Sequence, residues 1–243
     1  KVRDDIVDQL KIEYNLSLSS FNRPNLFYRV KERTEEALYK ALEPYRERSV
    51  IIYCSTRKTT ENVTEALKRR GYKAEAYHAG LSSVVRSETQ NRFTNDQTKV
   101  IVATVAFAMG IDKPDIRLVV HYGLPKSIEG YYQETGRAGR DGLKGECLLL
   151  YKSGDFVKPV GASQISLEVL TAVNTYAISG ECRRKLLLSY FKEKFDSPNC
   201  QSCDNCVEGD SSLKDLDLSR YNLDELVNNI LGAVIYTNNR SGE

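Results

Sequence analysis

Residues 133–142 carry the strongest chemical signal in the sequence, Gln-Glu-Thr-Gly-Arg-Ala-Gly-Arg-Asp-Gly. Arg137 and Arg140 are three positions apart, so on a helix they would project from one face, and the glycines between them would keep that face open to a ligand. Arginine suits bidentate contact with phosphate and stabilises charge on a transferring phosphoryl group. The segment therefore indicates a phosphate-facing site, although a solvated basic helix end would explain the same residues.

A second polar segment follows a buried strand pattern. Residues 52–57 run from apolar side chains into Ser55, Thr56 and Arg57. Hydroxyl and guanidinium groups at a strand end are suitable donors to a nucleic-acid backbone, where contacts fix position rather than read sequence. A helix N-cap at Ser55 or Thr56 is the simpler role, and both roles can hold together.

A third segment, residues 100–115, leads from an apolar strand through small residues to an acid. Thr104 at the strand end can hydrogen-bond a phosphate. Asp112, just beyond Gly110, can accept a hydrogen bond from a sugar hydroxyl. An ordinary strand and loop with an acidic turn residue is the alternative for this segment taken alone.

Four of the six cysteines form a cluster with the spacing C-x17-C-x2-C-x2-C: Cys182, Cys200, Cys203 and Cys206. Short C-x2-C spacings let one turn offer several thiolates to one tetrahedral ion, and four sulfurs complete a closed, structural zinc site. Disulfides and unpaired thiols are the alternatives. The start of the chain lacks a secretory apolar stretch, which predicts a reducing compartment and favours metal. Cys54 and Cys147 lie in apolar runs and are predicted to be buried thiols.

These segments need a scaffold that gathers strand ends, and residues 25–151 alternate strand and helix patterns. Predicted strands cover 25–30, 49–54, 73–77, 99–104, 117–122 and 146–151, and predicted helices cover 32–43, 59–70, 82–94 and 127–135. This alternation predicts an α/β fold, a parallel sheet with helices on both faces and ligands at the carboxyl ends of its strands. The loops after Cys54, Tyr77, Thr104 and Tyr122 should therefore share one functional edge.

Beyond the sheet, the sequence predicts helices at 165–179, 182–195 and 222–236, with the cysteine-rich residues between the last two. Composition is that of an ordinary globular protein, with 41% hydrophobic and 28% charged residues. The net charge is only +2, so nucleic acid would have to bind through a local patch. No apolar run is long enough to span a membrane, and we expect no membrane partner. The charged start without Met suggests part of a longer chain.

In this order and at this spacing, the three polar segments resemble motifs IV, V and VI of the second RecA-like domain of superfamily 2 helicases. Residues 20–25 (Ser-Phe-Asn-Arg-Pro-Asn), 77–81 (Tyr-His-Ala-Gly-Leu) and 121–127 (His-Tyr-Gly-Leu-Pro-Lys-Ser) narrow the resemblance to the RecQ family, over residues 18–210. The resemblance implies a RecA-like sheet followed by a small helical zinc-binding module, in which the four clustered cysteines hold structural Zn²⁺.

The resemblance also implies roles at the nucleotide. Arg140 would be the arginine finger and Arg137 would couple hydrolysis to strand movement, with the division between the two left open. Gln133 belongs to the same catalytic group. Asp112 would approach the ribose, and Gly110 would lie beside it in the nucleotide site that Arg137 and Arg140 complete.

For nucleic acid, the resemblance implies that the tracked DNA strand passes near Ser55, Arg57, His78 and Thr104. Only two histidines occur in the chain, and both fall in these motifs. A lone histidine is more often a structural hydrogen-bonding group, and we expect that role for His121.

The sequence contains no G-x-x-x-x-G-K-[ST] loop for phosphates and no Asp-Glu-x-His run for magnesium. In the RecQ family both lie in a first RecA-like domain, which we expect to precede residue 1 of the parent chain and to be a partner of this segment. ATP and Mg²⁺ would bind only with that domain, and the chain alone would be inactive.

The predicted organisation has four parts. A lead-in linker covers 1–24, the second RecA-like helicase domain 25–153, the helical zinc-binding module 154–210, and a linker 211–243. In the last part, the predicted helix either begins a winged-helix domain or packs on the zinc module.

The predicted function is the C-terminal motor half of an ATP-dependent 3′–5′ DNA helicase acting on single-stranded and forked DNA, in repair and recombination. Its location would be the nucleus of a eukaryote or the cytoplasm of a bacterium. A non-catalytic, zinc-stabilised nucleic-acid-binding adaptor is the alternative; the missing phosphate loop favours it, whereas the complete arginine motif favours an enzyme. An RNA helicase of superfamily 2 is a weaker alternative, against which the cysteine cluster argues.

Overall fold

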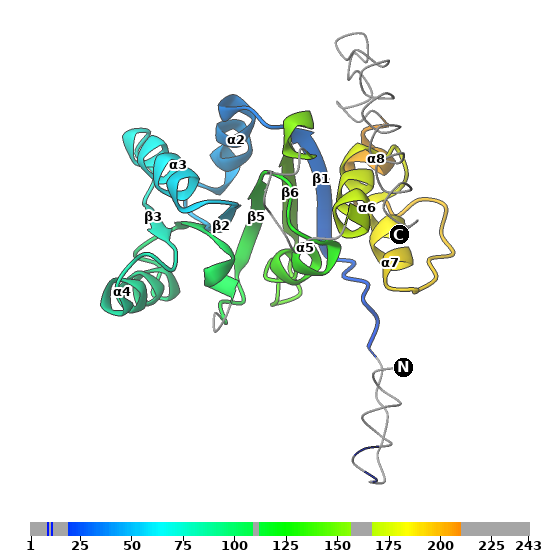
Figure 1. Cartoon of the computed structure of the whole chain (residues 1–243), viewed down its shortest axis with the longest axis horizontal. Coiled ribbons are helices and arrows are strands. Elements are labelled where there is room, and N and C mark those ends of the chain that lie inside the picture. The colour runs from blue at the N-terminus through cyan, green and yellow to red at the C-terminus, as the bar shows by residue number, and fades with distance from the viewer. Residues whose placement is uncertain (1–8, 10, 12–18, 109–111, 157–166, 210–243) are drawn as a thin grey trace, which may run out of the picture.

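The computed structural model describes residues 9, 11, 19–108, 112–156 and 167–209. Six parallel strands form one sheet in the order β1-β6-β5-β2-β4-β3 (Figure 1). The strands are β1 (Leu26–Glu32), β2 (Ser49–Cys54), β3 (Ala74–Tyr77), β4 (Val100–Ala103), β5 (Ile116–Tyr122) and β6 (Gly145–Tyr151). The helices are α2 (Glu35–Leu42), α3 (Arg57–Arg69), α4 (Ser83–Thr94), α5 (Ile128–Thr135), α6 (Leu167–Ile178), α7 (Arg183–Tyr190) and α8 (Asp204–Val207). Short 3-10 turns cover Glu43–Tyr45, Val105–Ala108 and Ser153–Phe156. The predicted parallel α/β fold is confirmed.

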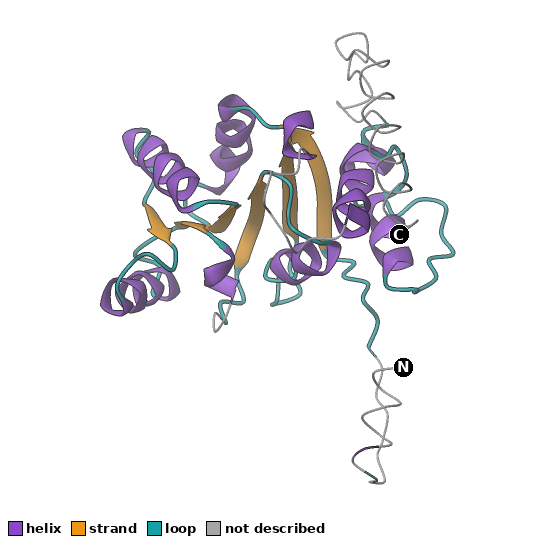
Figure 2. Cartoon of the chain, viewed as in Figure 1, coloured by secondary structure: helices purple, strands orange, loops and turns teal. Residues whose placement is uncertain are grey.

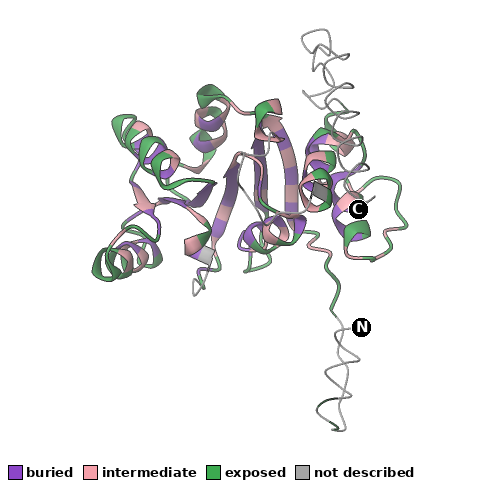
Figure 3. Cartoon of the chain, viewed as in Figure 1, coloured by how far each residue is buried: buried purple, intermediate pink, exposed green. Residues whose placement is uncertain are grey.

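Both faces of the sheet are covered by helices, as Figure 2 shows. Alternate residues of one strand serve different cores, because successive side chains point to opposite faces. Ile51 and Tyr53 of β2 join the core that α4 and α5 cover, whereas Val50 and Ile52 join the core under α2 and α3. All six residues of β2 are buried, which explains why the sequence shows a continuous apolar run there instead of alternation. The helices expose their outer faces (Figure 3).

Helix ends follow local chemistry that the sequence signals. The side chain of Thr56 accepts a hydrogen bond from the backbone N–H of Thr59 and caps α3, and Ser82 caps α4 in the same way. Gly71 follows α3 with φ of +79°, a conformation that glycine adopts without strain. Because α3 begins directly after β2, the first polar residues beyond the strand lie at the carboxyl edge of the sheet.

The zinc module, which we define as the described residues 167–209, packs against the β1 edge of the sheet (Figure 1). Tyr28 of β1 pairs with Cys203 in a parallel bridge and donates its backbone N–H to the carbonyl oxygen of Ser202, 3.2 Å away. The N–H of Val30 donates to Asp204 Oδ2 at 2.8 Å. The module thus satisfies backbone groups that would otherwise leave a sheet edge open to pairing with another chain.

Several predictions fall on residues outside the described ranges. They are most of the lead-in linker, the nucleotide contact at Gly110 and the helix expected at 222–236. The predicted buried thiols are confirmed, since Cys54 and Cys147 are buried and burial raises the pKa of each.

Candidate functional site

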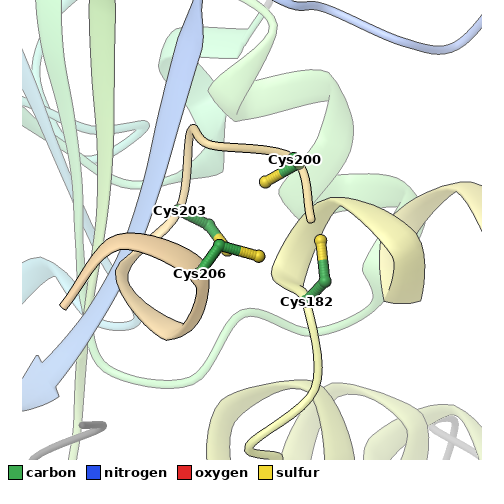
Figure 4. Close-up of side chains that lie close together, drawn as sticks. All are labelled: Cys182, Cys200, Cys203 and Cys206. Atoms are coloured by element: carbon green, nitrogen blue, oxygen red, sulfur yellow. The ribbon is translucent and has the colours of Figure 1, made fainter. Parts of the chain in front are cut away.

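The four clustered cysteines converge on one point (Figure 4). The Sγ atoms of Cys182, Cys200, Cys203 and Cys206 all lie within 4.8 Å of one another. Cys182 caps the amino end of α7 instead of lying within the helix, and Cys203 caps α8. Two helix beginnings and the loop between them therefore supply all four sulfurs.

This arrangement fits a tetrahedral zinc ion. Zn–S bonds of about 2.3 Å place the sulfurs of a tetrahedral site about 3.8 Å apart, within the spread seen here. A hydrogen bond with Cys203 lowers the pKa of the Cys200 thiol to about 4 and raises that of Cys203. Cys200 is thus favoured as the thiolate, which is the form that binds metal. The chain's own residues close the site, which makes a bound zinc structural.

A buried ion pair supports the cluster. Arg183 is fully buried, and its Nε donates to Asp204 Oδ1 at 3.0 Å. The same guanidinium donates to the carbonyl oxygens of Tyr176 and Ala177 in the last turn of α6. Since Asp204 also accepts from the backbone of β1, the Arg183–Asp204 pair joins α6, α7 and the sheet. A buried charge is tolerated only with such partners.

The arginine motif departs from the prediction that both arginines lie on one helix face. Helix α5 ends at Thr135, and the arginine loop, defined as residues 136–142, continues as a series of turns. Arg137 is buried with 4% of its surface exposed, whereas 38% of the Arg140 side chain is exposed. Gly139 has φ of +54°, which a helix cannot contain. The two arginines therefore face different surroundings.

Arg140 reaches Asp112, the acid predicted to lie in the same nucleotide site. Its Nη1 lies 3.1 Å from Asp112 Oδ1, and the carboxylate is 91% exposed. Arg137 instead lies beside Tyr53. Burial raises the pKa of the Tyr53 hydroxyl, and the positive charge of Arg137 partly offsets that rise. The structure thus brings together Arg140 and Asp112, which are 28 positions apart. An exposed arginine with an exposed partner is available to an anionic ligand.

A cavity of about 250 Å³ opens at the carboxyl ends of β2, β4 and β5. Ser55, Thr104 and Gln133, from the three polar segments, all line it, as the predicted common edge requires. Lys126 adds a positive charge to the wall. Hydroxyl, amide and ammonium groups are suited to contact a sugar-phosphate backbone.

The other two predicted DNA-contact residues lie near each other outside this cavity. Arg57 is exposed in the first turn of α3, and both its guanidinium and the His78 ring lie close to Gly80. His78 is 3% exposed and its Nε2 lies 3.2 Å from Glu61 Oε1. Burial favours a structural role for His78, and its contact with DNA stays a prediction.

The role of Glu134, the partner of His121, was missed by the sequence analysis. His121 and Glu134 line the cavity and form a buried pair, with Nε2 and Oε2 2.7 Å apart. The His121 ring also stacks on Tyr53. These residues hold β5 against α5 beneath Gln133, in agreement with the structural role expected of His121. Glu134 is the next-to-last residue of α5, two positions before the C-cap Gly136, and a single buried acid at a helix end gives no periodic signal that would have identified it.

Models of known protein families match both the sheet domain and the zinc module. A model of the helicase conserved C-terminal domain matches residues 33–142, and a model of RecQ zinc-binding domains matches residues 155–207. The ATP-dependent DNA helicase RecQ of Pasteurella multocida is 42% identical over 218 residues, covering 85% of this chain and 34% of that protein. A putative ATP-dependent RNA helicase, R290, of Acanthamoeba polyphaga mimivirus is 40% identical, covering 84% and 40%.

The fold comparison agrees. The structure of Saccharomyces cerevisiae Dbp5 bound to RNA and ADP BeF3 superposes with a TM-score of 0.56 at 23% identity, over 72% of this chain and 46% of that one. That likeness shows the fold alone. The chain spans about a third of the length of the RecQ relative. No helix in the described part of the chain is long and apolar enough to cross a membrane.

The parallel sheet with its arginine loop is a RecA-like helicase C-terminal domain. The four-cysteine module on its β1 edge matches the RecQ zinc-binding domain. The chain belongs to the RecQ family, of which it represents the helicase C-terminal domain and the zinc-binding module.

Proposed function

We propose that this chain is the C-terminal motor half of an ATP-dependent 3′–5′ DNA helicase. Arg140, Arg137 and Gln133 would act on ATP bound between this domain and a preceding RecA-like domain, and Asp112 would contact the ribose. The observation that carries the proposal is the pairing of Arg140 with Asp112, together with the cavity that residues of all three motifs line.

Different residues of the domain would contact the nucleotide and the DNA strand. Arg140 is exposed and able to move toward a γ-phosphate, where such an arginine stabilises transition-state charge. Ser55 and Thr104 offer hydroxyls, and Arg57 a charge, to the backbone of the tracked strand. Closing and opening of the two RecA-like domains on ATP would move that strand past these contacts.

Phosphates and Mg²⁺ would be held by the preceding domain, because the sequence contains no phosphate-binding loop. We therefore assign this chain no ATP turnover of its own. The structural zinc would keep the module folded on β1 and take no part in hydrolysis. Forked DNA is the proposed substrate of the whole protein, in repair and recombination. We place it in the nucleus of a eukaryotic cell or the cytoplasm of a bacterial one.

A strand-displacement assay tests the proposal. The chain joined to its preceding RecA-like domain should, with ATP and Mg²⁺, displace a labelled strand from a duplex with a 3′ single-stranded DNA tail. A duplex with a 5′ tail should stay intact. Preference for RNA over DNA would favour the activity in the name of the mimivirus relative, and binding without ATP-dependent displacement would favour the adaptor.

A further inference from the structure

Residues 22–26, which we call the clamp segment, lie between the zinc module and the arginine loop. The guanidinium of Arg23 donates hydrogen bonds to three carbonyl oxygens of the loop, those of Gly136 at 3.2 Å, Ala138 at 3.1 Å and Gly139 at 3.0 Å. Asn25 Nδ2 donates to the carbonyl oxygen of Gly139 at 2.8 Å. The backbone of the arginine loop is therefore held from outside by side chains more than a hundred positions away in the chain.

The opposite side of the clamp segment is held by the zinc module. Arg184, two positions after the cluster residue Cys182, is 4% exposed. It donates to the Asn22 side chain at 2.7 Å and to the carbonyl oxygens of Arg23 at 2.6 Å and Leu26 at 2.7 Å. A hydroxyl of the module, Ser202 Oγ, also donates to the Leu26 carbonyl at 3.0 Å.

The physical reason for these contacts is the end of α5. The last carbonyl oxygens of a helix lack internal partners, and a cation at that end is favourable. Arg23 supplies the charge and a donor to the carbonyl oxygen of the C-cap Gly136, and further donors to those of Ala138 and Gly139 in the turns just beyond. Gly139 shows how closely the loop fits, because a Cβ there would lie 2.5 Å from the Leu143 carbonyl oxygen and 2.6 Å from Asn25 Nδ2. The loop that carries Arg137 and Arg140 therefore depends on the clamp segment for its shape.

We propose that Arg23 is a positioning residue that transmits the folded state of the zinc module to the arginine loop. Loss of the metal would release the amino end of α7, where Cys182 is the cap and Arg184 lies in the first turn. The clamp segment would then lose its anchor, and Arg23 would no longer fix the loop carbonyls. Only the consequence for hydrolysis rests on the proposed function.

Hydrogen–deuterium exchange of the zinc-loaded chain tests the positioning directly. Amides in the loop are hydrogen-bonded, for example the Gly139 N–H to the Ile116 carbonyl at 2.8 Å, so their exchange reports local opening. Arg23→Gln should speed exchange of peptides covering 136–142 about tenfold, as loss of charge-assisted bonds implies. Arg23→Lys keeps the positive charge but lacks the several N–H donors of the guanidinium, and should give an intermediate exchange rate.

Arg29→Gln is the matched control. Arg29 lies on β1 and forms ion pairs with Glu146 of β6 and Glu208 of the zinc module, neither of which belongs to the arginine loop. This variant should leave exchange of 136–142 unchanged. Chelation of zinc should speed loop exchange in the wild-type chain and add little in Arg23→Gln. Unchanged loop exchange in zinc-loaded Arg23→Gln, or equal acceleration in β2 and β5, would overturn the proposal.

Steady-state kinetics test the consequence in the chain joined to its preceding domain. Arg23→Gln should lower kcat for ATP about tenfold with KM unchanged, because the loop arginines act in the transition state. A normal kcat with a loosened loop would overturn the link to hydrolysis. If the unaltered joined protein turned over no ATP, the proposed function would fail while the exchange result still decided the positioning.

Discussion

The cysteine cluster and the arginine loop differ in how much of each proposed ligand site this chain supplies. The cluster has four sulfurs within 4.8 Å, drawn from two helix beginnings and the loop between them. The arginine loop has one buried and one exposed arginine, and the exposed one faces an acid that is itself exposed. A structural site is closed by its own chain, whereas a site that works by domain closure is left half open.

The largest expected effect is at the closed site. Cys203→Ser should abolish stoichiometric zinc binding and unfold residues 167–209, since structural zinc contributes on the order of 10–16 kcal/mol of apparent binding free energy in small modules. Metal content by atomic emission and thermal unfolding would check this. Cys54→Ser, at a buried thiol outside the cluster, should retain zinc. A Cys203→Ser chain with normal zinc content would remove the distinction between the two sites.

The next effect is at the open site. In the chain joined to its preceding domain, Arg140→Ala should lower kcat for ATP by about 10³ or more, because an arginine finger acts on transition-state charge. Folding should be unaffected, since the side chain is exposed. Arg48 directly precedes β2, at the amino ends of the strands. The Arg48→Ala protein is the control and should turn over ATP normally. If Arg137→Ala alone had this effect on kcat, the two roles would have to be exchanged.

A smaller loss of stability is expected when the buried Arg183–Asp204 pair beside the cysteine cluster is broken. Asp204→Asn leaves Arg183 buried without its charge partner and should lower the free energy of unfolding by about 3 kcal/mol. Urea denaturation of the zinc-loaded chain would measure the change. Glu65→Gln, which breaks the exposed pair with Lys68, should change stability very little. Equal stability of both variants would mean that the buried pair adds nothing to the module.

The smallest effect is expected in the strand-end cavity. Ser55→Ala and Thr104→Val should each weaken binding of single-stranded DNA about three- to tenfold, the loss of one hydrogen bond to a phosphate. Fluorescence anisotropy at fixed salt would measure the affinities, since such binding depends on ionic strength. Thr94→Ala, at the far end of α4, is the control. Unaltered affinity in both cavity variants would place the DNA elsewhere on the surface.

Local pattern predicted most of the scaffold. Apolar runs marked four of the six predicted strands, β2, β4, β5 and β6, and β2 has the predicted bounds because both of its faces are buried. The four-cysteine spacing predicted the cluster, because C-x2-C geometry is local and only Cys182 has to come from farther away. The helix cap at Thr56, one of the two residues predicted for that role, was also readable, since the capping side chain and its amide are three positions apart.

The conformation of the arginine loop could not be predicted, because it depends on contacts between residues far apart in the chain. The arginines were expected on one helix face, yet α5 ends at Thr135, whose hydroxyl bonds back to the Tyr131 carbonyl at 2.8 Å, and the loop beyond is shaped by Arg23. Arg23 reaches it across 113 positions, and Arg184 reaches Asn22 across 162. No spacing rule links such residues. The sequence therefore predicts which residues form each site better than it predicts what holds them in place.

The most direct test of the half-open site is ATP turnover by this chain alone, zinc-loaded and in the presence of single-stranded DNA and Mg²⁺. We expect no turnover above background from the isolated chain, and DNA-stimulated turnover when it is joined to its preceding RecA-like domain. DNA-stimulated turnover by the isolated chain would contradict the account, because it would require a complete phosphate site within these residues.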